Sequence, residues 1–280
     1  VSKEARFFLQ GISQIDRILE WDSFVPFQLL REKFDILINL EKIPGVCSLT
    51  DMMDAWSRYG FRFDSIWGTF HAYENGENCF RYLLDKSDGA QQRKYWQQVL
   101  IEMLNVKWTG QEYLLGYQPK APPAFDVGLN HQVGSKWPSK AMPQRRWKEL
   151  AAQLSDAGYT VSWQEGFNNL KTYIDWISSN RLIVSTDSLG LHLALALKRR
   201  VVGLFGPTDP NEVYFYDRGQ ALCSTEPCAS MPCYSGTCHT NIECMKYFNI
   251  ERIVNSVTEH LEMPDGETVP RSQTAVVCRP

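Results

Sequence analysis

Short apolar runs alternate with helix-like patterns in the second half of the chain. Residues 182–184 and 201–205 are apolar runs of the kind found in strands buried on both faces. Between them, residues 189–197 are apolar nearly all round, which predicts a buried helix with Asp187 or Ser188 as its N-cap. Two such strands joined by a helix predict a parallel βαβ unit.

The same alternation recurs on both sides of a proline-rich segment, residues 119–123. Proline stiffens a chain and blocks regular pairing, so this segment is the expected linker. We expect further strands at residues 15–21, 34–40, 125–129 and 159–163. We expect helices at residues 24–33, 43–59, 79–84, 95–104, 146–157, 170–178 and 249–261, with an irregular, aromatic-rich stretch at 60–72.

The pattern therefore predicts an α/β protein with two parallel-sheet domains and a cleft between them. The expected divisions are an N-terminal domain of residues 1–118, a C-terminal domain of residues 119–262 and a disordered tail of residues 263–280.

Composition excludes several classes of protein. A net charge of −3 over 280 residues, without a long basic run, argues against a general nucleic-acid binder. No apolar run approaches the roughly 20 residues that span a bilayer. The first residues are charged and no apolar stretch of a signal peptide follows them, so we expect a cytoplasmic protein.

Polar side chains follow two strands of the C-terminal domain. Thr186, Asp187, Ser188 and His192 come after the strand at residues 182–184, where open α/β sheets bind ligands and a helix N-terminus offers free amides to an anion. The alternative is an ordinary core crossover with a capped helix. Because an Asp and a His occur together with a second polar loop, Gly-Pro-Thr-Asp-Pro, after the next strand, the ligand-site interpretation is preferred.

A further polar loop, residues 130–143, follows the first strand of the same domain. Gly134 and Ser135 free its backbone to approach a ligand, and Lys136 and Lys140 supply positive charge, a combination suited to phosphate. The alternative is a surface loop with ordinary lysines. A ligand with a phosphate part and a polyhydroxyl part, such as a nucleotide-sugar, would satisfy both loops, with Asp187 placed on sugar hydroxyls or on capping amides.

Five of the eight cysteines crowd into one segment. Cys228, Cys233, Cys238 and Cys244 offer four thiolates, which suit a structural tetrahedral Zn or Fe site. The alternative is a set of reduced cysteines, including Cys223, that pack a loop. A disulfide framework is disfavoured by the absence of a secretion signal.

Several motifs resemble family 9 of the glycosyltransferases, the bacterial heptosyltransferase group that builds the lipopolysaccharide core. They are Asp-Ser-Leu-Gly-Leu-His at residues 187–192, Gly-Pro-Thr at 206–208, the loop from Val127 to Trp147 and Phe-Asp-Ile-Leu-Ile-Asn-Leu-Glu-Lys at 34–42. The family pattern is Asp-[Thr/Ser]-Gly-x-x-His, so Gly190 stands one place later here. The cysteine segment ending in Cys244-Met245 also resembles the C-terminal region of the family.

The resemblance implies a GT-B fold of two Rossmann-like domains. It also implies donor binding by Asn130, Gly134, Ser135, Lys136, Lys140, Thr186, Asp187, Ser188, Leu189, Gly190, His192, Pro207 and Thr208. The implied chemistry is inverting, metal-independent transfer of heptose or a related sugar from an ADP-heptose-like donor to a lipopolysaccharide or other glycan acceptor. The implied partners are that donor and a lipid-linked or glycan acceptor, with room for peripheral contact with the cytoplasmic face of the inner membrane.

The resemblance also predicts an incomplete N-terminal domain. The family starts with a βαβ unit whose Gly-Asp loop supplies the Asp taken as catalytic base, and the present sequence matches the family only after that unit, about 50–60 residues. The alternative to an enzyme is therefore a non-catalytic nucleotide-sugar-binding or scaffold protein that kept the fold. A third class is a metal-sensing module built on the cysteine segment.

Overall fold

The computed structural model of the chain describes residues 1–73, 76, 94–166, 169–226 and 228–264. The chain divides into two compact units, here called the N-terminal and C-terminal units. The N-terminal unit contains Val1–Arg6, Ile15–Gln111 and Glu212–Tyr214, and the C-terminal unit contains Phe7–Gln14, Glu112–Asn211 and Phe215–Pro280. Both units mix helices with a sheet, which confirms the α/β fold class. The domain boundary after residue 118 stays a prediction.

The C-terminal unit is built on a five-stranded, all-parallel sheet with the strand order β5-β4-β6-β7-β8. Its strands are β4 (Phe125–Asn130), β5 (Val161–Trp163), β6 (Asn180–Thr186), β7 (Arg200–Phe205) and β8 (Gly219–Cys223). The central strands β6 and β7 are buried almost throughout, which explains why they read as continuous apolar runs in the sequence.

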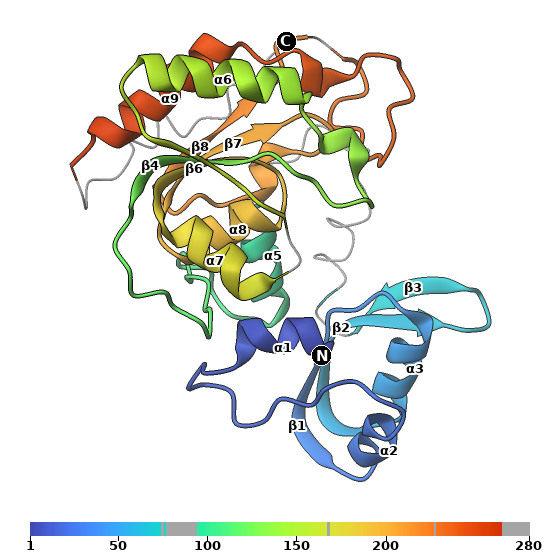
Figure 1. The fold of residues 1–280 in the computed structure, drawn as a ribbon. Helices are drawn as coiled ribbons and strands as arrows, with labels where there is room; N and C mark the ends of the chain where they lie inside the picture. Colours follow the sequence, from blue (N-terminus) through green and yellow to red (C-terminus); the bar gives the residue numbers. More distant parts are fainter. Residues whose placement is uncertain (74–75, 77–93, 167–168, 227, 265–280) are drawn as a thin grey trace. The chain divides into compact units, whose positions relative to one another are not determined.

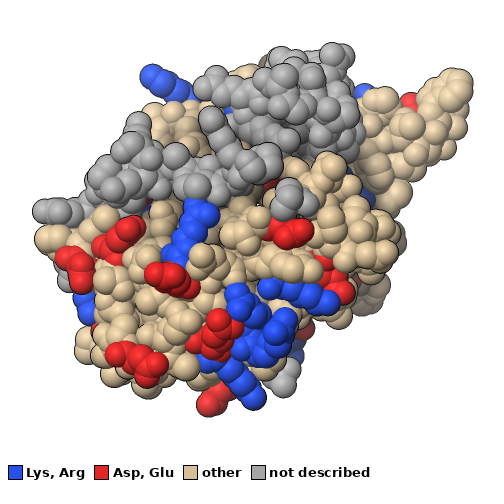
Figure 2. Space-filling view, turned by 90° about the horizontal axis from the view of Figure 1, so that it is seen from above, with Lys and Arg blue, Asp and Glu red and all other residues tan. Residues whose placement is uncertain are grey.

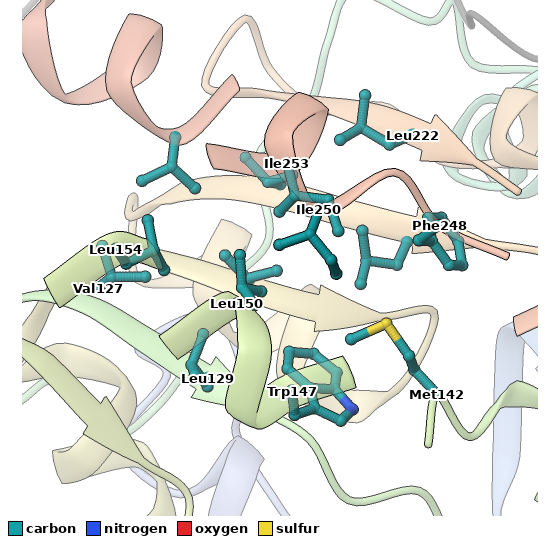
Figure 3. Packing of buried hydrophobic residues seen from close by; sticks show 14 of the residues in the cluster. Val127, Leu129, Met142, Trp147, Leu150, Leu154, Leu222, Phe248, Ile250 and Ile253 are labelled. Atoms are coloured by element: carbon teal, nitrogen blue, oxygen red, sulfur yellow. The ribbon is translucent and has the colours of Figure 1, made fainter. Parts of the chain in front are cut away.

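Helices cover both faces of this sheet (Figure 1). Helices α6 (Gln144–Asp156) and α9 (Ile250–Glu262) pack together on one face, and α7 (Leu170–Ser178) and α8 (Leu189–Ala196) pack together on the other. Figure 3 shows Trp147, Leu150 and Leu154 of α6 meeting strand side chains and α9 in the main core. Single 3₁₀ turns occur at Pro138–Lys140, Pro210–Glu212 and Cys244–Lys246.

The N-terminal unit contains a three-stranded sheet in the order β1-β2-β3. Strand β1 (Lys33–Asn39) pairs in parallel with β2 (Asp54–Asp64), which forms an antiparallel hairpin with β3 (Thr69–Ala72). Helix α3 (Pro44–Met52) connects the parallel pair and packs against both strands. Helices α2 (Val25–Leu29) and α5 (Trp96–Met103) also belong to this unit, whereas α1 (Lys3–Leu9) is divided between the two units after Arg6.

Several expectations for the N-terminal unit were wrong. The strand expected at residues 15–21 is absent, and the helix expected at 24–33 is the short α2. The helix expected at 43–59 ends at Met52, and the chain continues as β2 into a hairpin that spans the supposedly irregular stretch. Gly60, at φ +95, allows this strand to pass Asn39, because a Cβ there would lie 1.9 Å from the Asn39 carbonyl oxygen.

Two expectations fall on residues outside the described part of the chain: the helix at 79–84 and nearly all of the tail, from residue 265. Strand β8 was not expected from the sequence. Within the described residues, no helix has the length and apolar character needed to cross a membrane.

Candidate functional site

The ends of β4 and β6 mark the point where the strand order of the C-terminal sheet changes direction. Strand β5 lies on one side of β4 and β6 on the other, so the connections after β4 and β6 leave toward opposite neighbours. Asn130, the last residue of β4, pairs in register with Ser185 of β6. Open α/β sheets bind their ligands in the crevice at such a switch point. The polar loops found in the sequence therefore begin at the expected edge.

Asn130 holds the two strand ends and the start of α8 together. It is fully buried, and its amide donates to the hydroxyls of Ser185 (2.8 Å) and Ser188 (3.0 Å). Its carbonyl oxygen accepts a hydrogen bond from the Tyr173 hydroxyl at 2.7 Å. These contacts let Asn130 position Ser188, the N-cap of α8, and its predicted role in donor binding stays a prediction.

Gly190, which stands one place later than the glycine of the family pattern, occupies a tightly packed position in this chain. A Cβ at this position would lie 2.2 Å from the Tyr173 hydroxyl oxygen and 2.4 Å from the Asn130 amide nitrogen. The first turn of α8 therefore packs against the Asn130–Tyr173 pair at a distance that only glycine allows. Packing in this chain therefore requires glycine at position 190.

Lys140 and Asp187 form a partly buried ion pair at the centre of the site. The Lys140 ammonium lies 2.6 Å from Asp187 Oδ2, with the side chains 15% and 17% exposed. The Thr208 hydroxyl donates to the same carboxylate oxygen at 2.8 Å. Burial raises the pKa of Asp187, but the charge of Lys140 and these hydrogen bonds outweigh it, and its pKa is lowered. The structure thus brings together one residue from each of three loops.

Asp187 does not cap α8, contrary to one of the two roles expected for it. The described carboxylate contacts go to Lys140, to Thr208 and, at 3.8 Å, to Nε2 of His192. No side chain caps the N-terminus of α8. The first amides of this helix, at Leu189 and Gly190, therefore face the edge of the sheet without a competing side-chain oxygen, as an anion site requires.

His192 lies on the side of α8 that faces this cluster, and Tyr113 contacts it. The Tyr113 hydroxyl is 3.1 Å from His192 Nδ1, and the two rings meet edge to face. Burial lowers the pKa of His192, and Asp187 only partly offsets this. When the neutral imidazole accepts a hydrogen bond from the Tyr113 hydroxyl at Nδ1, its own proton is on Nε2, the nitrogen nearer Asp187.

Buried polar groups at this edge without a hydrogen-bond partner among the described residues include the hydroxyl of Thr186, at the end of β6, and the amide nitrogen of Gln164, just after β5. Nδ1 of His131, just after β4, is another. Gln164 is 3% exposed, and its oxygen accepts from the Gln132 backbone N–H at 3.1 Å. Unsatisfied groups of this kind in a native structure call for a ligand or water.

Sequence reasoning missed Tyr113, Gln164 and Tyr173. Gln164 could have been found, since it directly follows a strand of the same sheet. Tyr113 and Tyr173 reach the site from distant segments, and no local pattern marks them.

The rest of the β4–α6 loop lies nearer the surface. Gly134, Ser135 and Lys136 are exposed, and no described ion pair involves Lys136. The loop is fixed by the cysteine-containing segment, residues 228–244: the Ser139 hydroxyl donates to the Ser235 carbonyl at 2.6 Å. The same segment reaches the third loop through the Tyr234 backbone N–H, which donates to the Pro207 carbonyl at 2.8 Å. The cysteine-containing segment therefore supports two of the three site loops.

The predicted structural metal site is not formed by the cysteines of this segment. Cys228, Cys233, Cys238 and Cys244 are free, but the described residues contain no group of three or more His, Cys, Asp or Glu side chains placed to hold a metal ion. The Cys228 and Cys238 sulfurs approach the Thr240 hydroxyl instead.

The state of these cysteines also differs from one to the next. Burial, followed by the other three thiols, raises the pKa of Cys244 to about 11, which disfavours the thiolate that metals bind. Cys223 is disulfide-bonded, so the reduced state expected for it was wrong.

A hollow of about 570 Å³ lies between the starts of α6 and α9, away from the switch point. Arg145, Arg146 and Lys246 line it, together with Glu149 and Glu251. Figure 2 looks onto the side of α6 and α9 and shows basic side chains gathered in one area with acidic ones beside them. Because Arg146 is bound to Glu149 at 2.5 Å, much of the local charge is already compensated. The switch-point site is thus the stronger candidate.

Sequence comparison connects this site to a known family. Residues 166–242, which include the start of α8 and the loop after β7, match the model of glycosyltransferase family 9 (heptosyltransferase). The lipopolysaccharide heptosyltransferase 1 of Pseudomonas aeruginosa is 31% identical over 219 residues, 69% of this chain and 56% of the relative. The enzyme of the same name from Escherichia coli K12 is 27% identical over 106 residues, 30% of this chain and 33% of the relative. The chain thus spans about half the length of the P. aeruginosa relative and about a third of that of the E. coli relative.

Solved structures share the fold. A family 9 glycosyltransferase from Veillonella parvula superposes with a TM-score of 0.62 at 14% identity, covering 93% of this chain and 86% of the other. The E. coli heptosyltransferase WaaC with ADP superposes with a TM-score of 0.53 at 15% identity, covering 84% and 75%. The α/β fold with a parallel sheet is the one seen in the GT-B heptosyltransferases. The chain is a family 9 heptosyltransferase-like protein.

Proposed function

We propose that this protein is a glycosyltransferase that moves heptose or a related sugar from a nucleotide-sugar donor to a lipopolysaccharide or other glycan acceptor. One observation carries the proposal. Lys140, Thr208 and the uncapped start of α8 converge on Asp187 at the switch point of the C-terminal sheet. A diphosphate needs both a cation and free backbone amides, and these are the groups that the cluster offers.

The donor class follows from the chemistry of the cluster and from related proteins. Two solved neighbours are E. coli heptosyltransferase WaaC with ADP and with ADP-2-deoxy-2-fluoro heptose, with TM-scores of 0.53 and 0.52. We assign an ADP-linked sugar to this chain by analogy with them. The diphosphate would lie at the start of α8, and the unsatisfied Thr186 hydroxyl and Gln164 amide would meet polar groups of the nucleotide or sugar.

Asp187 has a positioning role in this arrangement. A carboxylate repels phosphate, but its lowered pKa keeps it charged at neutral pH and bound to Lys140. The pair holds the ammonium in place before the donor arrives, so less side-chain freedom is lost on binding. The second carboxylate oxygen, near His192, remains able to accept a hydrogen bond from a sugar hydroxyl.

The groups that bind the diphosphate would also help the nucleotide to leave. In an inverting transfer the acceptor oxygen attacks the anomeric carbon as the bond to the diphosphate breaks, and negative charge develops on the diphosphate. Lys140, the α8 amides and the Nε2–H of His192 would stabilise that charge from fixed positions. We therefore propose that charge stabilisation here comes from protein groups, consistent with an inverting, metal-independent reaction.

We also propose that the two predicted domains bind different substrates. Residues 119–262 would bind the donor, and residues 1–118 would belong to the acceptor side. We propose that the acceptor is lipid-linked or another glycan, and that the protein acts in the cytoplasm, at or near the inner membrane.

Calorimetric titration tests the donor site. ADP, ADP-heptose, GDP and UDP sugars are titrated into the wild-type protein, into Lys140→Ala and into Lys148→Ala, a matched control on the exposed side of α6. We expect an adenine nucleotide to bind and Lys140→Ala to weaken it at least tenfold, about 1.4 kcal/mol. Lys148→Ala should bind as the wild type does. Failure of every nucleotide to bind to folded protein would refute the donor site.

Product analysis separates the enzyme from the non-catalytic alternative. If the donor binds but mass spectrometry detects no sugar transfer to a lipopolysaccharide core acceptor, this chain is a nucleotide-sugar-binding protein without turnover.

A further inference from the structure

The turn of the β2–β3 hairpin presents two large apolar side chains to water. Ile66 is 85% exposed and Trp67 is 78% exposed, and they lie next to each other in the four-residue turn between Asp64 and Thr69. Among the large apolar side chains of the described residues, only Trp56 is more exposed. Adjacent exposed apolar side chains at a projecting turn indicate a contact surface.

The backbone of this turn is hydrogen-bonded internally. Asp64 Oδ1 accepts from the N–H groups of Ile66 (2.9 Å) and Trp67 (3.1 Å), and its carbonyl accepts from Gly68 N–H at 2.8 Å. These donors would stay paired if the turn left water. An element that enters a lipid environment must meet this requirement, because unpaired backbone groups are costly there.

Basic side chains lie directly behind the apolar tip. Arg62 on β2 and His71 on β3 pair in register across the hairpin, and both are exposed. Each lies two positions along its strand from the Asp64–Thr69 pair that closes the turn, and both help to lower the pKa of Asp64, after the larger effect of the turn N–H groups. An apolar tip with the Arg62 guanidinium behind it complements a surface whose interior is apolar and whose headgroups are anionic.

The hairpin that carries the tip is well packed. The rings of Phe63 and Phe70 contact each other across the strands with centroids 5.0 Å apart. Further from the turn, Phe61 and Ala72 belong to a buried cluster with Cys47. The exposed side chains of the turn are therefore carried by a packed, ordered hairpin.

We propose that the β2–β3 turn is a membrane-contact element that inserts Ile66 and Trp67 into the interfacial layer of an anionic lipid bilayer. Trp is suited to this layer because its ring is apolar and its indole N–H can still reach water. Arg62 meets lipid phosphates, and the exposed His71 lies beside it at the same level of the hairpin. The proposal deepens the proposed function, because a lipid-linked acceptor is presented at such a surface, but the contact does not require sugar transfer.

Vesicle flotation tests the contact with the full chain. The probes are vesicles of phosphatidylethanolamine and phosphatidylglycerol, and neutral vesicles of phosphatidylcholine. We expect stronger binding to the anionic vesicles although the protein itself has a net charge of −3. Ile66→Ser and Trp67→Ser should each lower the partition coefficient about tenfold, since each removes a large apolar group from the interface.

Two further variants sharpen the result. Trp56→Ser is the matched control: the residue is 92% exposed but lies near the start of β2, far along the strand from the turn, so binding should not change. Arg62→Gln should weaken binding to anionic vesicles only.

Three results would overturn the proposal. They are no flotation of the folded wild-type protein, equal losses in Trp56→Ser and Trp67→Ser, and a changed oligomeric state of Trp67→Ser in sedimentation with vesicle binding intact. A changed oligomeric state with intact vesicle binding would mean that Ile66 and Trp67 contact another protein chain and not a bilayer. ADP titration of each variant keeps the two hypotheses apart, since it reports the switch-point site alone.

Discussion

The two sheets of this protein use their polar and apolar residues in opposite ways. The C-terminal sheet buries its apolar strands between two helix layers and gathers polar side chains at the strand ends. The N-terminal sheet leaves Ile36 and Ile38 of its edge strand about half exposed and carries apolar side chains on its hairpin turn. A preorganised ligand site needs a rigid scaffold, whereas a contact surface needs accessible apolar groups. The difference fits the proposed donor site in the C-terminal unit and the proposed membrane contact of the N-terminal unit.

The comparison predicts that substitutions in the closely packed region around the switch point lower the stability of the C-terminal unit. Gly190→Ala should destabilise the C-terminal unit by about 3 kcal/mol, because the new methyl group meets the Tyr173 hydroxyl and the Asn130 amide. Urea denaturation followed by hydrogen exchange in peptides covering β6 and α8 would measure the change.

Gly134→Ala is the matched control for this substitution. Gly134 lies in the loop before α6, where an added methyl group would have no neighbour within 4 Å, so the stability of this variant should match that of the wild type. Equal exchange in the wild type and Gly190→Ala would show that α8 can move away from Asn130, and the site would then be less rigid than argued.

Much of the C-terminal unit could be predicted from the sequence, and the reason is physical. Strands β6 and β7 are buried on both faces, so each is an unbroken apolar run, and the polar residues after them mark the edge of the sheet. Strand β8 was missed because Gly219–Cys223 is short and lacks such a run.

The N-terminal unit was harder to predict. Strand β2 follows α3 after a single residue, and its aromatic and polar residues also fit a continuing helix, so tertiary pairing with β1 decides its conformation. Within the site, Lys140, Asp187 and Thr208 were found because each follows a strand. Tyr113 was not, because its contact with His192 joins residues 79 positions apart.

A second prediction concerns the charge at the centre of the site. The pKa of Asp187 is lowered in the folded protein, so its carboxylate contributes stability above the ordinary value of 3.8, and that stability is lost as pH falls through the lower folded value. With both side chains mostly buried, we expect a loss of about 1–2 kcal/mol in the C-terminal unit as pH falls below about 4.

Asp187→Asn should remove this part of the acid dependence, as measured by urea unfolding between pH 5 and pH 2.5. Glu149→Gln, in the more exposed Arg146–Glu149 pair, is the control and should leave it unchanged, because exposed ion pairs contribute little. An acid dependence that persists in Asp187→Asn would mean that Lys140 does not hold this carboxylate in solution.

The smallest effect is predicted in the N-terminal unit and has the opposite sign. Gly45 lies in the first turn of α3, is exposed and has no neighbour within 4 Å of an added methyl group. Gly45→Ala should therefore stabilise α3 by about 0.5 kcal/mol, since alanine loses less backbone freedom than glycine when a helix forms. Slower hydrogen exchange in peptides covering α3 would show this, with β6 and α8 unaffected. If Gly45→Ala instead speeds exchange there, α3 is as tightly constrained as α8, and the contrast between a rigid binding unit and a more tolerant docking unit would fail at the helix that joins β1 to β2.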